Sequence, residues 1–251
     1  MMDRTTLTLL PATDLATAAF PAPEAILAPI LSRGSQCLLY GLPGIGKSLV
    51  ALGMAHAAAT GGSFLGWHAP RPHRVLYLDG YTAPAEMQRR LALFGTPPPS
   101  LQFSLAAHNP GEVPNITELE SQARLMAGWR RPELVVLDDL TSLTGPHAAT
   151  ERWNDLRRFL LLQRRFGRAV LLVHHTHRDS QPPGSSQCED VLDVVLAARR
   201  PPDWQARDGA RVEIHVEKVR GLPGAALEPI EARLRDGRWH WHCARTMGGE
   251  R

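Results

Sequence analysis

Lysine is scarce in this sequence, because only Lys47 and Lys218 are lysines among 28 basic side chains. Cysteine is also rare: Cys37, Cys188 and Cys243 are widely spaced and form no C-x-x-C pair, which disfavours disulfides and a zinc site. No apolar run reaches the roughly 18 residues that cross a membrane. The beginning of the chain lacks the basic start and apolar block of a secretory signal. We therefore expect a cytoplasmic protein with reduced thiols and no membrane partner.

The charge balance decides little about partners. A formal net charge of +3 and a pI near 9.0 permit nucleic-acid binding without demonstrating it. The arginine-rich segment 150–166 is either a solvated helix face or a surface for DNA. The preference for arginine over lysine also fits a GC-rich genome, so charge alone favours no partner.

Apolar segments of strand and helix type alternate along the chain, which indicates one α/β domain. Residues 1–33, rich in Thr, Ala and Pro, predict an N-terminal arm, and residues 34–251 predict the domain. The alternation predicts a mostly parallel sheet flanked by helices, with antiparallel C-terminal strands. We expect strands at 36–40, 74–79, 101–105, 134–138, 169–173, 191–197, 212–216, 226–234 and 238–241, and helices at 47–60, 83–94, 116–129 and 150–166.

The segment Gly41–Ser48 reads GLPGIGKS and fits the phosphate-loop pattern G-x-x-x-x-G-K-[ST] at every fixed position. Glycines let successive backbone N–H groups turn toward one anion, and the following helix adds its positive N-terminus. Lys47 would reach the β- and γ-phosphates, and the Ser48 hydroxyl would hold Mg²⁺. We therefore predict ATP and Mg²⁺ as cofactors, bound by Gly41, Leu42, Pro43, Gly44, Ile45, Gly46, Lys47, Ser48 and Leu49.

Asp138 closes the apolar run Leu134–Leu137, as a second Mg²⁺-organising carboxylate does in phosphate-loop proteins. Ligands bind at the carboxyl edge of such a sheet, where a strand end holds a side chain rigidly. We predict that Asp138 and Ser48 share the metal, and that the neighbouring Asp139 points elsewhere.

The pair His174-His175 follows another predicted strand. One of the two histidines contacts the γ-phosphate or the attacking water, or else both simply cap the strand. Metal binding by His174, His175 and His177 is a third alternative, which is disfavoured because adjacent residues on a strand point to opposite faces.

Taken together, these residues resemble the RecA-like ATPases, and especially the RepA-like group of plasmid hexameric replicative helicases and related mobile-element ATPases. The resemblance covers roughly Pro21 to Trp241. It is carried by Gly41–Ser48, Val75–Gly80, Leu134–Asp138, Val173–Thr176, Gly184–Ser186 and Lys218–Arg220.

The resemblance implies a RecA-like P-loop NTPase core, a ring of identical subunits, which is a hexamer in this group, and ATP between neighbouring subunits. Lys218 and Arg220 would then reach a neighbour's nucleotide as equivalents of arginine fingers, and His175 would sense the γ-phosphate. Loops after Leu140 and Thr176 would face a channel for single-stranded DNA.

The sequence departs from this family at Tyr81, where the pattern places a catalytic glutamate. A phenol with a pKa of about 10 cannot accept a proton near neutral pH. Asp79 and Glu86 are nearby carboxylates, but neither occupies the matching position. We therefore expect hydrolysis to be slow or dependent on a partner.

The expected protein is thus an ATP-binding, helicase-like RecA relative that acts on DNA in plasmid or mobile-element replication. The first alternative is a nucleotide-gated assembly or regulatory protein with little turnover, which Tyr81 favours. A small-molecule kinase is the second alternative, and no basic lid or substrate pocket in the sequence supports it.

Overall fold

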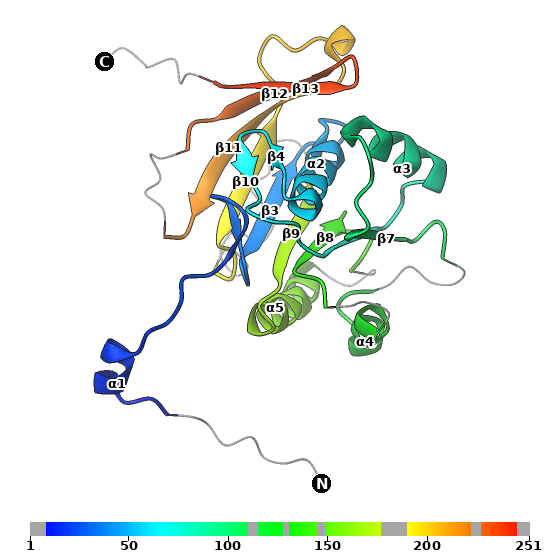
Figure 1. Cartoon of the computed structure of the whole chain (residues 1–251). Coiled ribbons are helices and arrows are strands. Elements are labelled where there is room, and N and C mark those ends of the chain that lie inside the picture. Colours follow the sequence, from blue (N-terminus) through cyan, green and yellow to red (C-terminus); the bar gives the residue numbers. More distant parts are fainter. Residues whose placement is uncertain are drawn as a thin grey trace.

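In a computed structural model, a nine-stranded sheet forms the centre of the protein, with strand order β13-β12-β11-β10-β3-β9-β8-β6-β7. The structure describes residues 9–109, 115–127, 131–144, 149–176, 190–221 and 227–244. The six strands from β10 to β7 run parallel, and β11, β12 and β13 continue the sheet antiparallel (Figure 1). The predicted mostly parallel sheet with antiparallel C-terminal strands is confirmed.

The strands and helices alternate through the first two thirds of the chain, as the apolar pattern predicts. The strands of the main sheet are β3 (Gln36–Gly41), β6 (Val75–Asp79), β7 (Leu101–Leu105), β8 (Leu134–Asp138), β9 (Ala169–His175), β10 (Val194–Arg199), β11 (Arg211–Val219), β12 (Ile230–Arg235) and β13 (Arg238–Cys243). The helices are α1 (Ala12–Thr17), α2 (Lys47–Thr60), α3 (Pro84–Leu91), α4 (Leu119–Ala127) and α5 (Ala149–Arg165), with short 3-10 turns η1 (Ala92–Phe94) and η2 (Ala206–Asp208).

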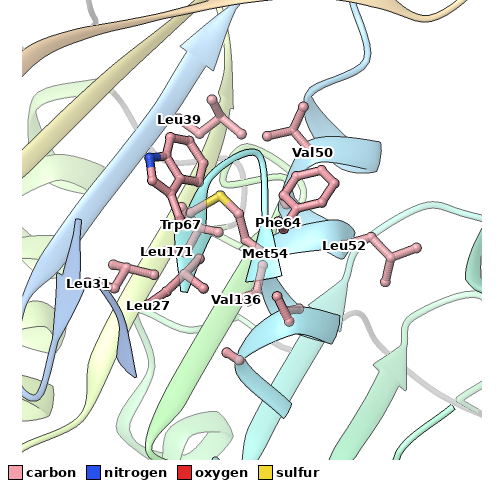
Figure 2. Packing of buried hydrophobic residues seen from close by; sticks show 14 of the residues in the cluster. Leu27, Leu31, Leu39, Val50, Leu52, Met54, Phe64, Trp67, Val136 and Leu171 are labelled. Atoms are coloured by element: carbon pink, nitrogen blue, oxygen red, sulfur yellow. The ribbon is translucent and has the colours of Figure 1, made fainter. Parts of the chain in front are cut away.

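Side chains of the central strands alternate between two apolar layers, because successive residues of a strand point to opposite faces. On β6, Tyr77 belongs to the layer that contains α2, whereas Leu76 belongs to the layer that contains Phe159 of α5. Figure 2 shows the first layer, where Met54 and Trp67 lie among leucines and valines. Both faces of the sheet are therefore covered, which explains why the strands read as continuous apolar runs.

Helix α2 lies inside the first layer and is buried along almost all its length. It starts after Gly46 and ends at Gly61, both of which have left-handed backbone (φ 100° and 70°). Glycine adopts this conformation without the penalty of a side chain, so the two residues set the limits of the helix. The predicted helix 47–60 has these same limits.

A hairpin of β1 (Ala25–Leu27) and β2 (Leu31–Ser32) lies within the segment 1–33 that we expected to be an arm. Its side chains Ile26, Leu27, Ile30 and Leu31 are buried in the layer around α2. A second hairpin, β4 (Ser63–Phe64) with β5 (Trp67–His68), packs beside it. Within the described part of this segment, α1 stands away from the domain and buries no residue (Figure 1).

Two late strands start after their predicted positions. Strand β10 begins at Val194 instead of residue 191, because the preceding Asp193 turns its carboxylate toward the backbone N–H of Gln36 and the side chain of Arg164. Strand β12 begins at Ile230 instead of residue 226. Among the helices of the described segments, none has the length and apolarity needed to cross a membrane.

Candidate phosphate-binding site

The phosphate loop connects the carboxyl end of β3 to the first turn of α2. A Cβ atom on Gly41 would lie 2.3 Å from the carbonyl oxygen of Ala198, so only glycine fits where the loop leaves the sheet. Together with the left-handed Gly46, this glycine turns the backbone toward the helix N-terminus. The loop therefore has the shape that lets backbone N–H groups surround an anion.

Lys47 is buried at the base of the loop and contacts main-chain oxygens. Its ammonium donates to the carbonyl oxygens of Gly41 at 2.8 Å and Leu42 at 2.7 Å. Burial lowers the pKa of Lys47 to about 8, and the nearby Asp138 and Asp139 partly oppose the shift. The ammonium thus sits where an incoming phosphate can replace two carbonyl oxygens as its partner.

Asp138 is completely buried and lies between Ser48 and Tyr77. Its carboxylate accepts hydrogen bonds from Ser48 Oγ at 3.1 Å and from the Tyr77 hydroxyl at 2.6 Å. Burial raises the pKa of Asp138 to about 6, although both hydrogen bonds favour the ionised form. The pairing of Ser48 with Asp138 brings together the two oxygen donors that we predicted for Mg²⁺, and oxygen donors are the ligands this ion prefers.

His175 lines the same region from the end of β9. Its Nε2 lies 3.7 Å from Asp139 Oδ2, and its side chain is about one third exposed (29%). Burial lowers the pKa of His175, as does the nearby Lys47, so the imidazole is neutral near pH 7. His174 lies against the ring of Trp153, away from the site.

Tyr81 lies at the rim of the site, in the turn after β6. The carboxylate of Asp79 accepts the backbone N–H groups of Tyr81 and Thr82, which fixes this turn. Burial raises the pKa of the Tyr81 phenol, against the effect of a hydrogen bond with Ser48. Oδ1 of Asp79 therefore holds the turn, whereas the buried Oδ2 has no hydrogen-bond partner in the described residues. The side chain beside Ser48 is a neutral phenol.

Glu86, the other carboxylate near Tyr81, is held by two arginines of α3. Arg89 Nη2 lies 2.6 Å from one carboxylate oxygen, and Arg90 Nε lies 2.7 Å from the other. The hydrogen bonds from Arg90 and then Arg89 lower the pKa of Glu86. A carboxylate held in this way is a weak base, so Glu86 does not take over the role expected at residue 81.

Lys47, Ser48, Tyr81, Glu86 and His175 line a cavity of about 450 Å³, whereas Asp79 and Asp138 are not part of its lining. Of the predicted loop residues, those from Gly44 to Leu49 other than Ile45 line it. Sequence reasoning missed Arg89, Arg90 and Leu93, although they follow Tyr81 on one predicted helix. The complete lining is Gly44, Gly46, Lys47, Ser48, Leu49, Tyr81, Glu86, Arg89, Arg90, Leu93, His175, Gly209, Ala210 and Leu234.

Lys218 and Arg220 are not brought to this cavity. Lys218 pairs across the sheet with Val195 of β10, near the amino ends of the parallel strands. Arg220 Nη2 donates to the carbonyl oxygen of Asp190 at 2.8 Å. Both residues therefore lie at the edge of the sheet opposite the phosphate loop of their own chain.

Several predicted features lie outside the described residues: the segment Gly184–Ser186, His177, and most of the loops expected to face DNA. Within the described ranges, no three His, Cys, Asp or Glu side chains gather closely enough to hold a metal ion. The predicted Mg²⁺ site rests instead on Ser48, Asp138 and the phosphates of a nucleotide.

Two comparisons with known proteins bear on the site. A family model described as an AAA domain matches residues 3–181, more than two thirds of the chain. The DNA repair protein RadA of Brucella abortus (strain 2308) is 27% identical over 170 residues, which cover 65% of this chain and 33% of that protein. The chain thus spans about one third of the length of this relative.

Proposed function

The chain belongs to the AAA domain family and is a RecA-like P-loop ATP-binding protein, and we propose that it assembles with copies of itself and acts on DNA. The observation that carries the nucleotide-dependent part of this function is the contact between Ser48 of the phosphate loop and Asp138 at 3.1 Å, directly beside the buried Lys47. The similarity to a DNA repair protein supports DNA as the target. Its place of action is the cytoplasm, and its context is plasmid or mobile-element replication or recombination, as in the RepA-like group.

In the nucleotide complex, Lys47 and the loop N–H groups hold the phosphates, while Ser48 and Asp138 hold Mg²⁺. The metal ion neutralises phosphate charge. Tyr77 orients the Asp138 carboxylate through its 2.6 Å hydrogen bond. His175 contacts the γ-phosphate from β9, and Lys218 with Arg220 complete the site of a neighbouring subunit in a ring.

Hydrolysis is slow or needs a partner, because Tyr81 stands where a carboxylate would orient the attacking water. The phenol lines the cavity, Asp79 is bonded to the backbone of the turn, and Glu86 is paired with two arginines. Loss of a general base costs roughly 10²- to 10⁴-fold in rate. ATP is therefore bound more readily than it is consumed.

The decisive experiment measures ATP hydrolysis with and without single-stranded DNA, together with the mass of the assembly with and without nucleotide. We expect ATP to increase the mass and DNA to increase the rate. If ATP drives assembly but DNA changes no rate, the alternative holds: a nucleotide-gated assembly protein, which Tyr81 favours. If ATP is not hydrolysed and does not change the mass of the assembly, both functions are contradicted.

The role of Tyr81 is tested by Tyr81→Glu, with Tyr81→Phe as the matched control. The new carboxylate lies beside Ser48 in the cavity, so we expect turnover to rise at least about tenfold. The phenylalanine variant keeps the ring and should turn over ATP at the original rate. An unchanged rate in Tyr81→Glu would show that a missing carboxylate is not what limits hydrolysis.

A further inference from the structure

The amino-terminal edge of the central sheet carries a row of arginines. Four adjacent parallel strands, β3, β9, β8 and β6, are each preceded within three residues by an arginine: Arg33, Arg168, Arg131 and Arg74. Neighbouring strands lie about 4.8 Å apart, so the row extends over about 14 Å. It lies opposite the phosphate loop, which leaves the carboxyl end of β3. We call these four residues the arginine row.

Contacts link the two ends of the row to the turns beside them. Arg33 lies against the turn that precedes β9. Arg168 stacks over the ring of Phe166 at 4.9 Å. Arg74 Nε donates to the carbonyl oxygen of Arg131 at 3.0 Å. Phe166 is 55% exposed, so an aromatic ring is open to solvent within the positively charged surface.

Two glutamates pair with the ends of the row. Glu24 lies 3.8 Å from Arg33, and Glu133 lies 3.6 Å from Arg74; both glutamates also bind Arg71. Among these described residues, five arginines share two carboxylates, so positive charge is in excess.

Arg131 and Arg168, two members of the row, repel each other electrostatically. Burial lowers the pKa of Arg168, and the nearby guanidinium of Arg131 lowers it further. An anion bound between two like charges removes this repulsion, because it favours the charged form of both. This part of the edge therefore favours an anionic ligand.

We propose that the arginine row and Phe166 form a site for the backbone and bases of single-stranded DNA that is separate from the loops after Leu140 and Thr176, which lie at the opposite edge of the sheet. This proposal rests on the proposed action on DNA. Guanidinium groups bind phosphate with two parallel hydrogen bonds, and an exposed ring stacks on an unpaired base. A row of this length can contact a few successive phosphates of one strand. An acidic peptide lacks a base to stack on Phe166, so DNA fits this surface better.

The test measures binding of a fluorescent oligothymidylate by anisotropy to wild type and to Arg131→Glu/Arg168→Glu. We expect the double variant to bind at least about tenfold more weakly, with a salt slope reduced by about 1.4 for two lost phosphates. Arg157→Glu/Arg158→Glu, which makes the same charge change on the exposed side of α5, should bind within about threefold of wild type. Phe166→Ala should weaken binding about fivefold or more, and Phe166→Trp should not.

Other outcomes contradict the proposal in distinguishable ways. If wild type binds DNA and the row variant binds equally well, or if only the α5 variant loses binding, the DNA site lies elsewhere and the proposed function stands. If wild type binds no DNA, the DNA part of that function fails as well. Competition by polyglutamate as strong as by DNA would show a general anion surface. Loss of ATP-dependent assembly in the row variant would show a contact between subunits.

Discussion

Asp138 shows at the scale of one residue how function opposes stability. The carboxylate of Asp138, the proposed Mg²⁺ ligand, is completely buried, and its pKa rises to about 6 because burial disfavours the charge. A group with a raised pKa stabilises the fold below its unfolded pKa of about 3.9, and this contribution is lost as the pH rises through about 6. Ionised Asp138 therefore destabilises the nucleotide-free protein at neutral pH, although the proposed metal site needs that charge.

Asp138→Asn should stabilise the nucleotide-free protein by about 3 kcal/mol at about pH 8, and the gain should vanish below about pH 3. The amide fits the two hydroxyl partners, Ser48 and Tyr77, because hydroxyls both donate and accept. Urea unfolding across this pH range measures the difference. A variant that is less stable at every pH would show that the hydrogen bonds outweigh the cost of burial.

At the scale of elements, the β1–β2 hairpin makes the core larger than the segment pattern predicts. Its four apolar side chains are buried against α2, whereas the neighbouring helix α1 buries nothing. The two segments also differ in composition, because the hairpin has four large apolar side chains and α1 has only Leu15. The apolar stretch is visible in the sequence, but its packing against α2 is decided by the tertiary structure.

Leu27→Ala should lower the free energy of unfolding by about 3 kcal/mol, because it removes a fully buried side chain and leaves a cavity. Leu15→Ala is the matched control, since Leu15 of α1 is 54% exposed, and it should change stability by less than about 0.5 kcal/mol. Urea denaturation of both variants checks the prediction. Equal, small effects would mean that the hairpin contributes nothing to the fold.

At the scale of the whole molecule, the sheet separates two groups of positively charged side chains, one at each edge. The carboxyl edge holds Lys47 in the phosphate loop, and the amino edge holds the arginine row and Lys218. Strand direction alone makes this division, because all six parallel strands begin at one edge and end at the other. Nucleotide bound at one edge stabilises the whole fold by mass action.

ATP with Mg²⁺ should raise the unfolding free energy by about 2.7 kcal/mol at a hundredfold excess over Kd. Lys47→Ala should abolish this increase, because it removes the ammonium that replaces carbonyl contacts with phosphate. Lys218→Ala should keep the increase in dilute protein, because Lys218 lies at the opposite edge. Thermal unfolding at several ATP concentrations measures both. Equal losses in the two variants would contradict the assignment of the two lysines.

The phosphate loop and the apolar strands could be read from the sequence, because their determinants are local. Eight consecutive residues contain the glycines, Lys47 and Ser48, and each buried strand is one short apolar run. The position of Asp138 could be predicted as well, because this residue directly follows one of these apolar runs. The engagement of Glu86 by the arginines of α3 was equally local, since all three residues lie on two turns of one helix, but it was missed.

Sequence alone determined that this protein binds phosphate at the end of a buried strand; tertiary structure decided what surrounds that phosphate. The Tyr77 hydrogen bond to Asp138, the cavity wall at Gly209 and Leu234, and the alignment of four arginines join residues far apart in the chain. These contacts depend on which strands become neighbours. Strand order is set by packing of the whole core, which no local pattern encodes.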